Sequence, residues 1–183
     1  MEWQVARDHL LGSEPTHPDQ FGEHPEPGLY AWWDPEGVLA SYFPDGFPPV
    51  YTSVPLYVGI AKTGLRVRGI TMHLSTTRVS TVRRSLAALL RDDLGLLPGI
   101  RPSARGTKFA IVPEHESALT EWMRAHLRVT LIGRANPGGV EQEIIESLTP
   151  PLNDVFAHGG PYWWRMRALR QQLIDDARQT SEF

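Results

Sequence analysis

The chain has 183 residues, carries a formal net charge of −3 and contains no cysteine. The lack of thiols excludes disulfide bonds, cysteine nucleophiles and thiolate metal sites, and no apolar run is long enough to span a membrane. An apolar fraction of 41%, with six tryptophans, is sufficient for the core of a single domain. The first residues lack the pattern of a secretory signal, so a cytoplasmic protein is expected.

Charge is distributed unevenly along the chain. The segment from Lys62 to Lys108 contains ten basic and two acidic residues, whereas the remainder is acidic. A positive face on an acidic body favours binding of a phosphate backbone through Lys and Arg side chains. An Arg-rich solvated surface that binds no ligand is the alternative that charge alone leaves open.

The first third of the chain alternates apolar or aromatic runs with turn-forming stretches. A partial apolar face over Glu2–Leu11 predicts a short helix. Two runs rich in aromatic and β-branched residues predict strands, at Leu29–Trp33 and Leu56–Ile60. The intervening segment Pro35–Pro55 contains five prolines and is interpreted as an insertion, with a hairpin around Val38–Phe43.

Helical patterns dominate the rest of the chain. A helix is predicted from Leu65 onward, with an interruption near Gly69, and Ser80 is a suitable N-cap for the next helix. The stretch Pro98–Thr107 predicts a basic loop. The remaining predicted elements are a strand at Lys108–Val112, a helix at Ser117–Leu127, a strand at Val129–Ile132, a helix ending near Leu148 and a terminal helix over Tyr162–Arg178.

Three stretches of the chain contain both apolar residues, which a core requires, and polar residues, which it does not. They are PGLYAWW (Pro27–Trp33), LYVGIAKTGLRVRGITMHL (Leu56–Leu74) and VEQEIIESLTPPLN (Val140–Asn153). Together they supply tyrosines, arginines, a histidine, glutamates and an asparagine. This combination suits hydrolysis of a phosphodiester with one divalent metal ion, which needs a nucleophilic water and stabilisation of the phosphoryl charge.

In order and internal spacing, these stretches resemble the GIY-YIG nuclease superfamily. Gly28-Leu29-Tyr30 occupies the place of the first motif, and Tyr57-Val58-Gly59 that of the second. Residues Gly64–Leu74 resemble the helix that supplies the family's arginine and often a histidine, and Glu141–Asn153 resembles its late helix. The resemblance implies an α+β fold in which helices flank a small antiparallel sheet of three strands. The implied single domain has its core at 28–153, an N-terminal extension at 1–27, a C-terminal helical extension at 154–183, and an insertion between the first two strands.

The resemblance also implies a metal-dependent endonuclease that cuts DNA, with RNA as an alternative substrate. The implied cofactor is Mg²⁺ or Mn²⁺, held by a single carboxylate because Mg²⁺ retains several of its own waters. Glu141 is the implied ligand, and Glu143 is the alternative. Glu141 opens a helix, where a carboxylate also compensates the helix dipole, so a purely structural role is open as well.

The other implied catalytic residues are two tyrosines, an arginine and a histidine. Tyr30 and Tyr57 would position or activate the water, and Arg68 would stabilise the phosphoryl charge, with Arg66 as the alternative. His73 follows Arg68 by five residues rather than by one helical turn, so either the helix is distorted or the assignment shifts, and a capping or packing role for His73 is open as well.

Further residues are assigned to substrate binding or to support of the site. Those expected to contact substrate phosphate are Lys62, Arg66, Arg78, Arg83 and Arg84. Gly28 and Gly59 are expected to allow close backbone approach, and Asn153 to tie the late helix to the sheet. Two alternatives are a nucleic-acid-binding module of the same fold that does not cut, and an interaction module whose tryptophans contact a protein partner or a second copy.

Overall fold

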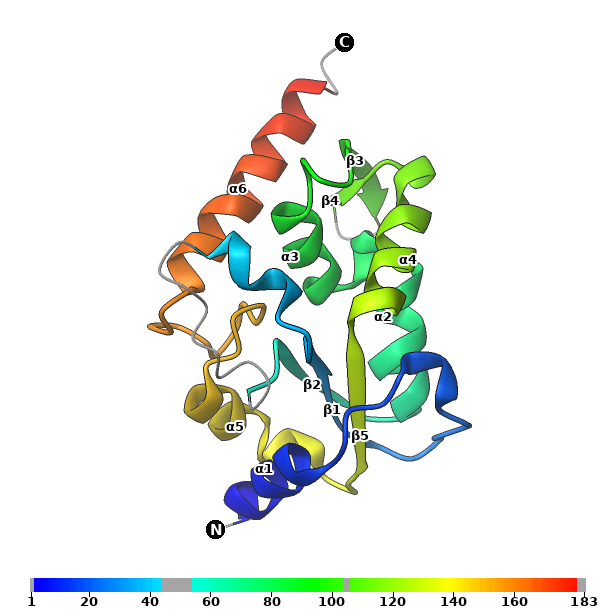
Figure 1. Ribbon diagram of the computed structural model, residues 1–183, viewed down its shortest axis with the longest axis vertical. Coiled ribbons are helices and arrows are strands. Elements are labelled where there is room, and N and C mark those ends of the chain that lie inside the picture. The colour runs from blue at the N-terminus through cyan, green and yellow to red at the C-terminus, as the bar shows by residue number, and fades with distance from the viewer. Residues whose placement is uncertain (1, 44–53, 104–105, 181–183) are drawn as a thin grey trace.

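An antiparallel sheet of three strands lies at the centre of the fold (Figure 1). The computed structural model describes residues 2–43, 54–103 and 106–180. The strands are β1 (Gly28–Trp33), β2 (Tyr57–Ala61) and β5 (Arg128–Gly133), in the order β2-β1-β5. The expected α+β class and three-stranded sheet are confirmed. Within the described ranges, no helix is long and apolar enough to cross a membrane.

The sheet is covered on both faces, because side chains of the central strand β1 alternate between two apolar layers. Tyr30 and Trp32 face the layer that contains α3 and α4. Leu29 and Trp33 face the opposite layer, which contains α1 and α5 (Figure 1). The α-helices are α1 (Glu2–Gly12), α2 (Met72–Ser75), α3 (Thr81–Leu89), α4 (Glu116–His126), α5 (Glu141–Leu148) and α6 (Trp163–Thr180).

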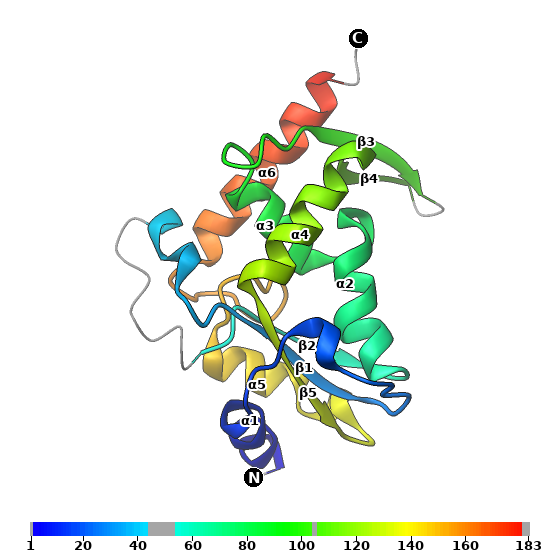
Figure 2. The same cartoon turned by 45° about the vertical axis from the view of Figure 1, so that its right-hand side comes forward.

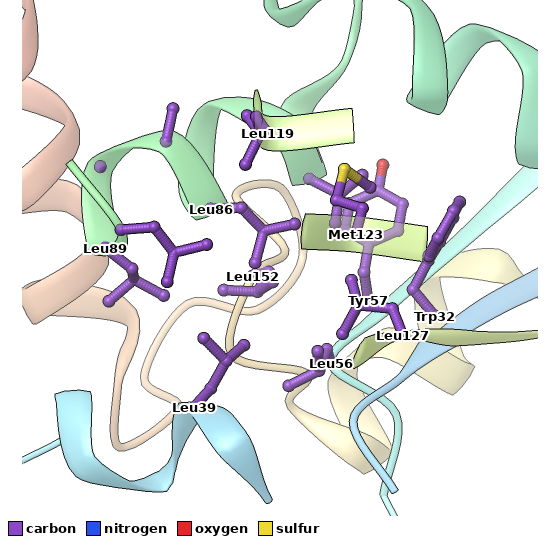
Figure 3. Packing of buried hydrophobic residues seen from close by; sticks show 14 of the residues in the cluster. Trp32, Leu39, Leu56, Tyr57, Leu86, Leu89, Leu119, Met123, Leu127 and Leu152 are labelled. Carbon is purple, nitrogen blue, oxygen red and sulfur yellow. The ribbon is translucent and has the colours of Figure 1, made fainter. Parts of the chain in front are cut away.

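The larger apolar layer fixes α3 and α4 over the face that carries the tyrosines. Ser80 caps α3 as predicted, since its hydroxyl oxygen accepts the N–H of Arg83 at 3.1 Å. Figure 3 shows Leu86 of α3 and Met123 of α4 gathered with the aromatic side chains of β1 and β2. Close packing of this kind holds the buried aromatic rings in defined orientations.

The segment after β1 differs from the predicted hairpin around Val38–Phe43. It forms the 3₁₀ helix η2 (Val38–Tyr42). The carboxylate of Asp34 accepts the N–H groups of Val38 at 3.0 Å and Leu39 at 2.8 Å, which favours a helical turn over a strand. Residues 44–53 of the expected insertion lie outside the described residues.

The prediction of a basic loop at Pro98–Thr107 is also wrong. It belongs to an antiparallel hairpin of β3 (Pro98–Ser103) and β4 (Gly106–Ile111), so the strand expected at Lys108–Val112 is the second arm. Proline and arginine have little intrinsic preference for strands, and the pairing therefore comes from the partner strand. Figure 2 shows the hairpin beside α6. Side chains of residues 101–109 lie outside the described part of the chain.

Candidate active site

A pocket of about 450 Å³ lies beside the edge strand β2. Its wall combines Tyr57 of β2, Arg84 of α3 and Glu141 of α5. Asn153 and Asp154, from the loop after α5, complete this side of the pocket. The fold therefore gathers side chains from the second and third motif-like stretches, together with an arginine from the basic segment, around one hollow.

Tyr30 and Tyr57 project from neighbouring strands onto the same face of the sheet. Tyr30 is opposite Gly59 and Tyr57 is opposite Trp32, which makes the two tyrosines diagonal neighbours. Their ring centroids are 6.3 Å apart, with the planes inclined by 29°. Tyr30 has no exposed surface, whereas Tyr57 is 8% exposed and lines the pocket. Tyr57 is therefore the phenol that a molecule in the pocket can reach.

Glycines make room for the first tyrosine and for the close pairing of β1. A Cβ at Gly59 would lie 2.5 Å from Oη of Tyr30, and one at Gly69 would lie 3.0 Å from its Cγ. A Cβ at Gly28 would lie 2.1 Å from the carbonyl oxygen of Ile132. The expected close backbone approach is present at Gly28, whereas at Gly59 the approaching group is the side chain of Tyr30. The sequence did not predict that Gly69 makes room for Tyr30. A glycine within a helical stretch was the signal that could have indicated it.

The helix after β2 contains a π-helical turn, η4 (Val67–Thr71), which absorbs the unusual spacing between Arg68 and His73. The N–H of Met72 bonds to the carbonyl of Val67, five residues earlier, as in a π-helix. The extra residue per turn keeps His73 on the face that packs against Tyr30. The distortion that the resemblance required is therefore present at the required place.

His73 is fully buried and has a partner at each ring nitrogen. Nε2 lies 2.8 Å from Oη of Tyr30, and Nδ1 lies 2.7 Å from Oγ of Ser80. A neutral imidazole donates from one ring nitrogen and accepts at the other, so Ser80 and Tyr30 take opposite hydrogen-bonding roles towards His73. Ser80, predicted only as an N-cap, is thus also a partner of the site histidine.

Burial and nearby charges set the ionisation of these groups. Burial, aided by the positive charges of Arg68 and Arg83, lowers the pKa of His73 to about 3, so the imidazole is neutral. Burial raises the pKa of Tyr30 well above its ordinary value, and the neighbouring Tyr57 raises it further. Burial also raises the pKa of Tyr57, but Arg68 and a hydrogen bond donated by Tyr30 lower it. Tyr57 is therefore the more readily ionised phenol.

The two candidate arginines lie in different surroundings. Arg66 donates from Nε to the carbonyl of Phe21 at 3.0 Å and so holds the N-terminal segment. Arg68 lowers the pKa of both Tyr57 and Glu141 through its positive charge. Its Nη1 is buried and has no hydrogen-bond partner among the described residues. A buried guanidinium nitrogen without a partner is unfavourable and suits an anionic ligand, which favours Arg68 for the phosphate role.

The two candidate glutamates also differ in their surroundings. Glu141 is the first residue of α5, is half-buried and lines the pocket with Tyr57. Burial raises the pKa of its carboxyl group, whereas the positive charges of Arg68 and Lys62 lower it. Glu143 is exposed. The geometry therefore favours Glu141 as the carboxylate of the pocket.

The remaining cations expected to bind substrate do not form one surface. Arg83 is fully buried and forms an ion pair with Glu116 at 2.7 Å. The expectation of a substrate contact is therefore not met for Arg83, whose charge stabilises the packing of α3 against α4. Lys62 and Arg78 are exposed, and Arg84 is half-buried in the wall of the pocket.

Asn153 closes the free edge of β2. Its Oδ1 accepts the N–H of Val58 and its Nδ2 donates to the carbonyl of Val58, both at 2.9 Å. An edge strand otherwise presents unpaired backbone groups. The expected hydrogen bonds to the sheet are therefore present, and they hold the loop after α5 against the strand that carries Tyr57.

The match to known families covers the same elements that build this pocket. The family described as the GIY-YIG catalytic domain matches residues 28–158, well over half of the chain. The chain belongs to the GIY-YIG family. No curated protein and no solved structure matches it. Membership implies a nuclease-type function on nucleic acid, and GIY-YIG nucleases generally use divalent metal ions.

The donor set of this GIY-YIG pocket fits a hard divalent cation with few protein ligands. Among the residues that the structure describes, no three His, Asp or Glu side chains come together to hold a metal. Mg²⁺ retains several waters and is usually bound through one or two carboxylates. The half-buried carboxylate of Glu141 meets that requirement, with the positive charge of Arg68 nearby for the anionic substrate.

Proposed function

We propose that this GIY-YIG domain is an endonuclease that hydrolyses phosphodiester bonds in DNA with a single Mg²⁺ or Mn²⁺ ion held by Glu141. The observation that carries the proposal is the shared pocket of Tyr57 and Glu141, on both of which the charge of Arg68 acts. When bound, the ion supplies charge stabilisation to the phosphoryl group and lowers the pKa of a coordinated water.

Tyr57 is the proposed residue that positions the attacking water, and it accepts the water's proton only after its own phenolic proton has left, because the phenol is protonated at neutral pH. Burial raises its pKa, and the charges of Arg68 and Arg84 counter this effect. The hydrogen bond from Tyr30 also favours the phenolate of Tyr57, since it is donated to the phenol oxygen. A nearby base of this kind typically contributes about 10²- to 10⁴-fold to the rate.

Arg68 and His73 complete the proposed chemistry in separate ways. Arg68 is proposed to stabilise the phosphoryl charge, because its Nη1 has no hydrogen-bond partner among the described residues and a guanidinium stays charged throughout the reaction. His73 is neutral and bonded to Tyr30, so it positions that phenol. No imidazolium charge then competes with Arg68 for the substrate.

Two features favour the alternative of a non-cutting module, namely the unusual spacing of Arg68 and His73 and the negative net charge of the chain. The π-helical turn accounts for that spacing while His73 keeps its contact with Tyr30. The local structure therefore supports a complete site rather than a degraded one.

The test is a cleavage assay on supercoiled plasmid, branched DNA and RNA, each with Mg²⁺, with Mn²⁺ and with EDTA. Nicked or linear DNA that forms only with a divalent ion is the expected result. Cleavage that persists in EDTA would reject the metal-dependent mechanism. DNA binding without products would support the non-cutting module, and cleavage confined to RNA would correct the substrate.

A further inference from the structure

A second pocket, of about 410 Å³, adjoins the active pocket and is walled on one side by α6. The two pockets share Arg84, Asp154 and Val155 in their linings. Trp163 and Arg167 of α6 also line the second pocket. The family match ends at residue 158, so this wall belongs to the C-terminal extension of this chain.

A buried polar network fixes α6 against the active-site loop. Arg170 is only 8% exposed and donates to Oγ of Ser85 at 2.6 Å and to the carbonyl of Leu152 at 2.9 Å. It also forms an ion pair with Asp154 at 2.9 Å. The indole N–H of Trp163 donates to the carbonyl of Asp154 at 3.0 Å. The wall of the second pocket is thus attached directly to the residue that follows Asn153.

Two cations in this pocket remain free of carboxylate partners. Asp154 is already paired with Arg170. The guanidinium of Arg84 donates to Oγ1 of Thr81 at 3.0 Å and to backbone carbonyls. Arg167 is exposed and lies over the ring of Trp163, 5.1 Å from the centroid. Neither arginine forms an ion pair within the described ranges, so positive charge extends from the active pocket onto α6.

We propose that the second pocket is a subsite for the phosphate backbone of the nucleic acid that is cut. The inference rests on the proposed function. The strand whose scissile phosphate occupies the first pocket continues past Arg84, and Arg167 binds a flanking phosphate. A guanidinium held over an indole by a cation–π contact has less side-chain freedom to lose when its N–H groups bind an anion.

The same arrangement explains how a chain of net charge −3 binds a polyanion. Affinity for a phosphate backbone depends on local Lys and Arg contacts rather than on the total charge. The two adjoining pockets supply such a track through Arg84 and Arg167, and the charge of Arg68 acts on Tyr57 and Glu141 in the first pocket. Because Arg167 lies in the second pocket and away from Tyr57 and Glu141, it should affect binding and leave the chemical step intact.

The experiment measures binding of a fluorescein-labelled DNA duplex and of its single strand over a salt series. Glu141→Gln serves as the background so that the DNA stays intact. Arg167→Ala is compared with Arg167→Lys, which keeps the charge. Arg178→Ala is the matched control, since Arg178 is exposed on the same helix, paired with Asp175 and outside the pocket.

Arg167→Ala should weaken binding about three- to tenfold and reduce the slope of log affinity against log salt by about one. Arg167→Lys should keep the slope, and Arg178→Ala should match the parent. In the active protein, Arg167→Ala should raise KM for DNA and leave kcat unchanged.

If the active protein cuts DNA but Arg167→Ala keeps the parental affinity and slope, the subsite is refuted and the proposed function stands. Equal losses in Arg167→Ala and Arg178→Ala would also refute it, because they would indicate a general charge effect. A wild-type protein that neither cuts nor binds these DNAs would reject the proposed function and the subsite together.

Discussion

The hydroxyl of Tyr30 lies 2.8 Å from Nε2 of His73, and neither side chain has exposed surface. This contact joins the central strand to the helix that carries Arg68. Buried polar groups that lose their partner cost about 1–3 kcal/mol. The pair therefore contributes to stability, and its effects can be separated from those of Tyr57, which lines the pocket.

Acidification should destabilise the fold through His73. Its pKa falls from an ordinary 6.5 to about 3 in the folded state, so the unfolded chain binds an extra proton between these values. Stability is therefore lost as pH falls below the unfolded value, by about 2 kcal/mol between pH 7 and pH 5. Urea unfolding of wild type and His73→Gln at both pH values measures this. The variant cannot titrate there and should lose about 2 kcal/mol less. Equal losses would contradict a neutral, buried His73.

The two tyrosines should respond differently to removal of their hydroxyls. Tyr57→Phe should reduce single-turnover cleavage about 10²- to 10⁴-fold and should lower the unfolding free energy less than Tyr30→Phe does, because Tyr30 keeps its contact with His73. Tyr30→Phe should lower the unfolding free energy by about 1–3 kcal/mol, because Nε2 of His73 loses its partner. Cleavage rates and urea unfolding of both variants are compared. The assigned roles would be contradicted if Tyr30→Phe were as stable as the wild type while Tyr57→Phe was unfolded. They would also be contradicted if Tyr57→Phe were fully active.

Gly59 should not tolerate a side chain, since a Cβ there would lie 2.5 Å from Oη of Tyr30. Gly59→Ala should displace that ring and destabilise the protein by about 1–3 kcal/mol. Gly138→Ala is the control, because the nearest atom to its Cβ would be Cδ1 of Ile60 at an ordinary 3.9 Å. Thermal unfolding distinguishes the two. Equal midpoints for both variants would show that the ring is not confined as described.

The strands of the site could be predicted because their signals are local. Aromatic and apolar residues over Leu29–Trp33 and Leu56–Ile60 predict strands without knowledge of their partners. The role of Asn153 could also be predicted, because a polar side chain that follows the prolines ending a helix is suited to a hydrogen bond with a neighbouring strand. Its partner Val58 is 95 residues away, and the resemblance to a family indicated the sheet but not this residue.

Other features depend on partners that a local pattern does not reveal. The indole N–H of Trp32 donates to the carbonyl of Gly69, 37 residues further on, within the π-helical turn. Arg83 was expected at the surface because arginines usually lie there, but Glu116 provides an ion pair that allows burial. The wall contributed by α6 likewise depends on tertiary contacts of Arg170, which the helical pattern alone does not indicate.

The most direct test of the single-carboxylate site compares Glu141→Gln with Glu143→Gln in Mg²⁺-dependent cleavage of DNA under single-turnover conditions. Each change removes one negative charge from the first turn of α5, but only Glu141 lines the pocket with Tyr57. Glu143→Gln should cut at the wild-type rate, and Glu141→Gln should be slower by about 10³-fold or more, through loss of the metal's contribution. Wild-type cleavage by Glu141→Gln would contradict the assignment.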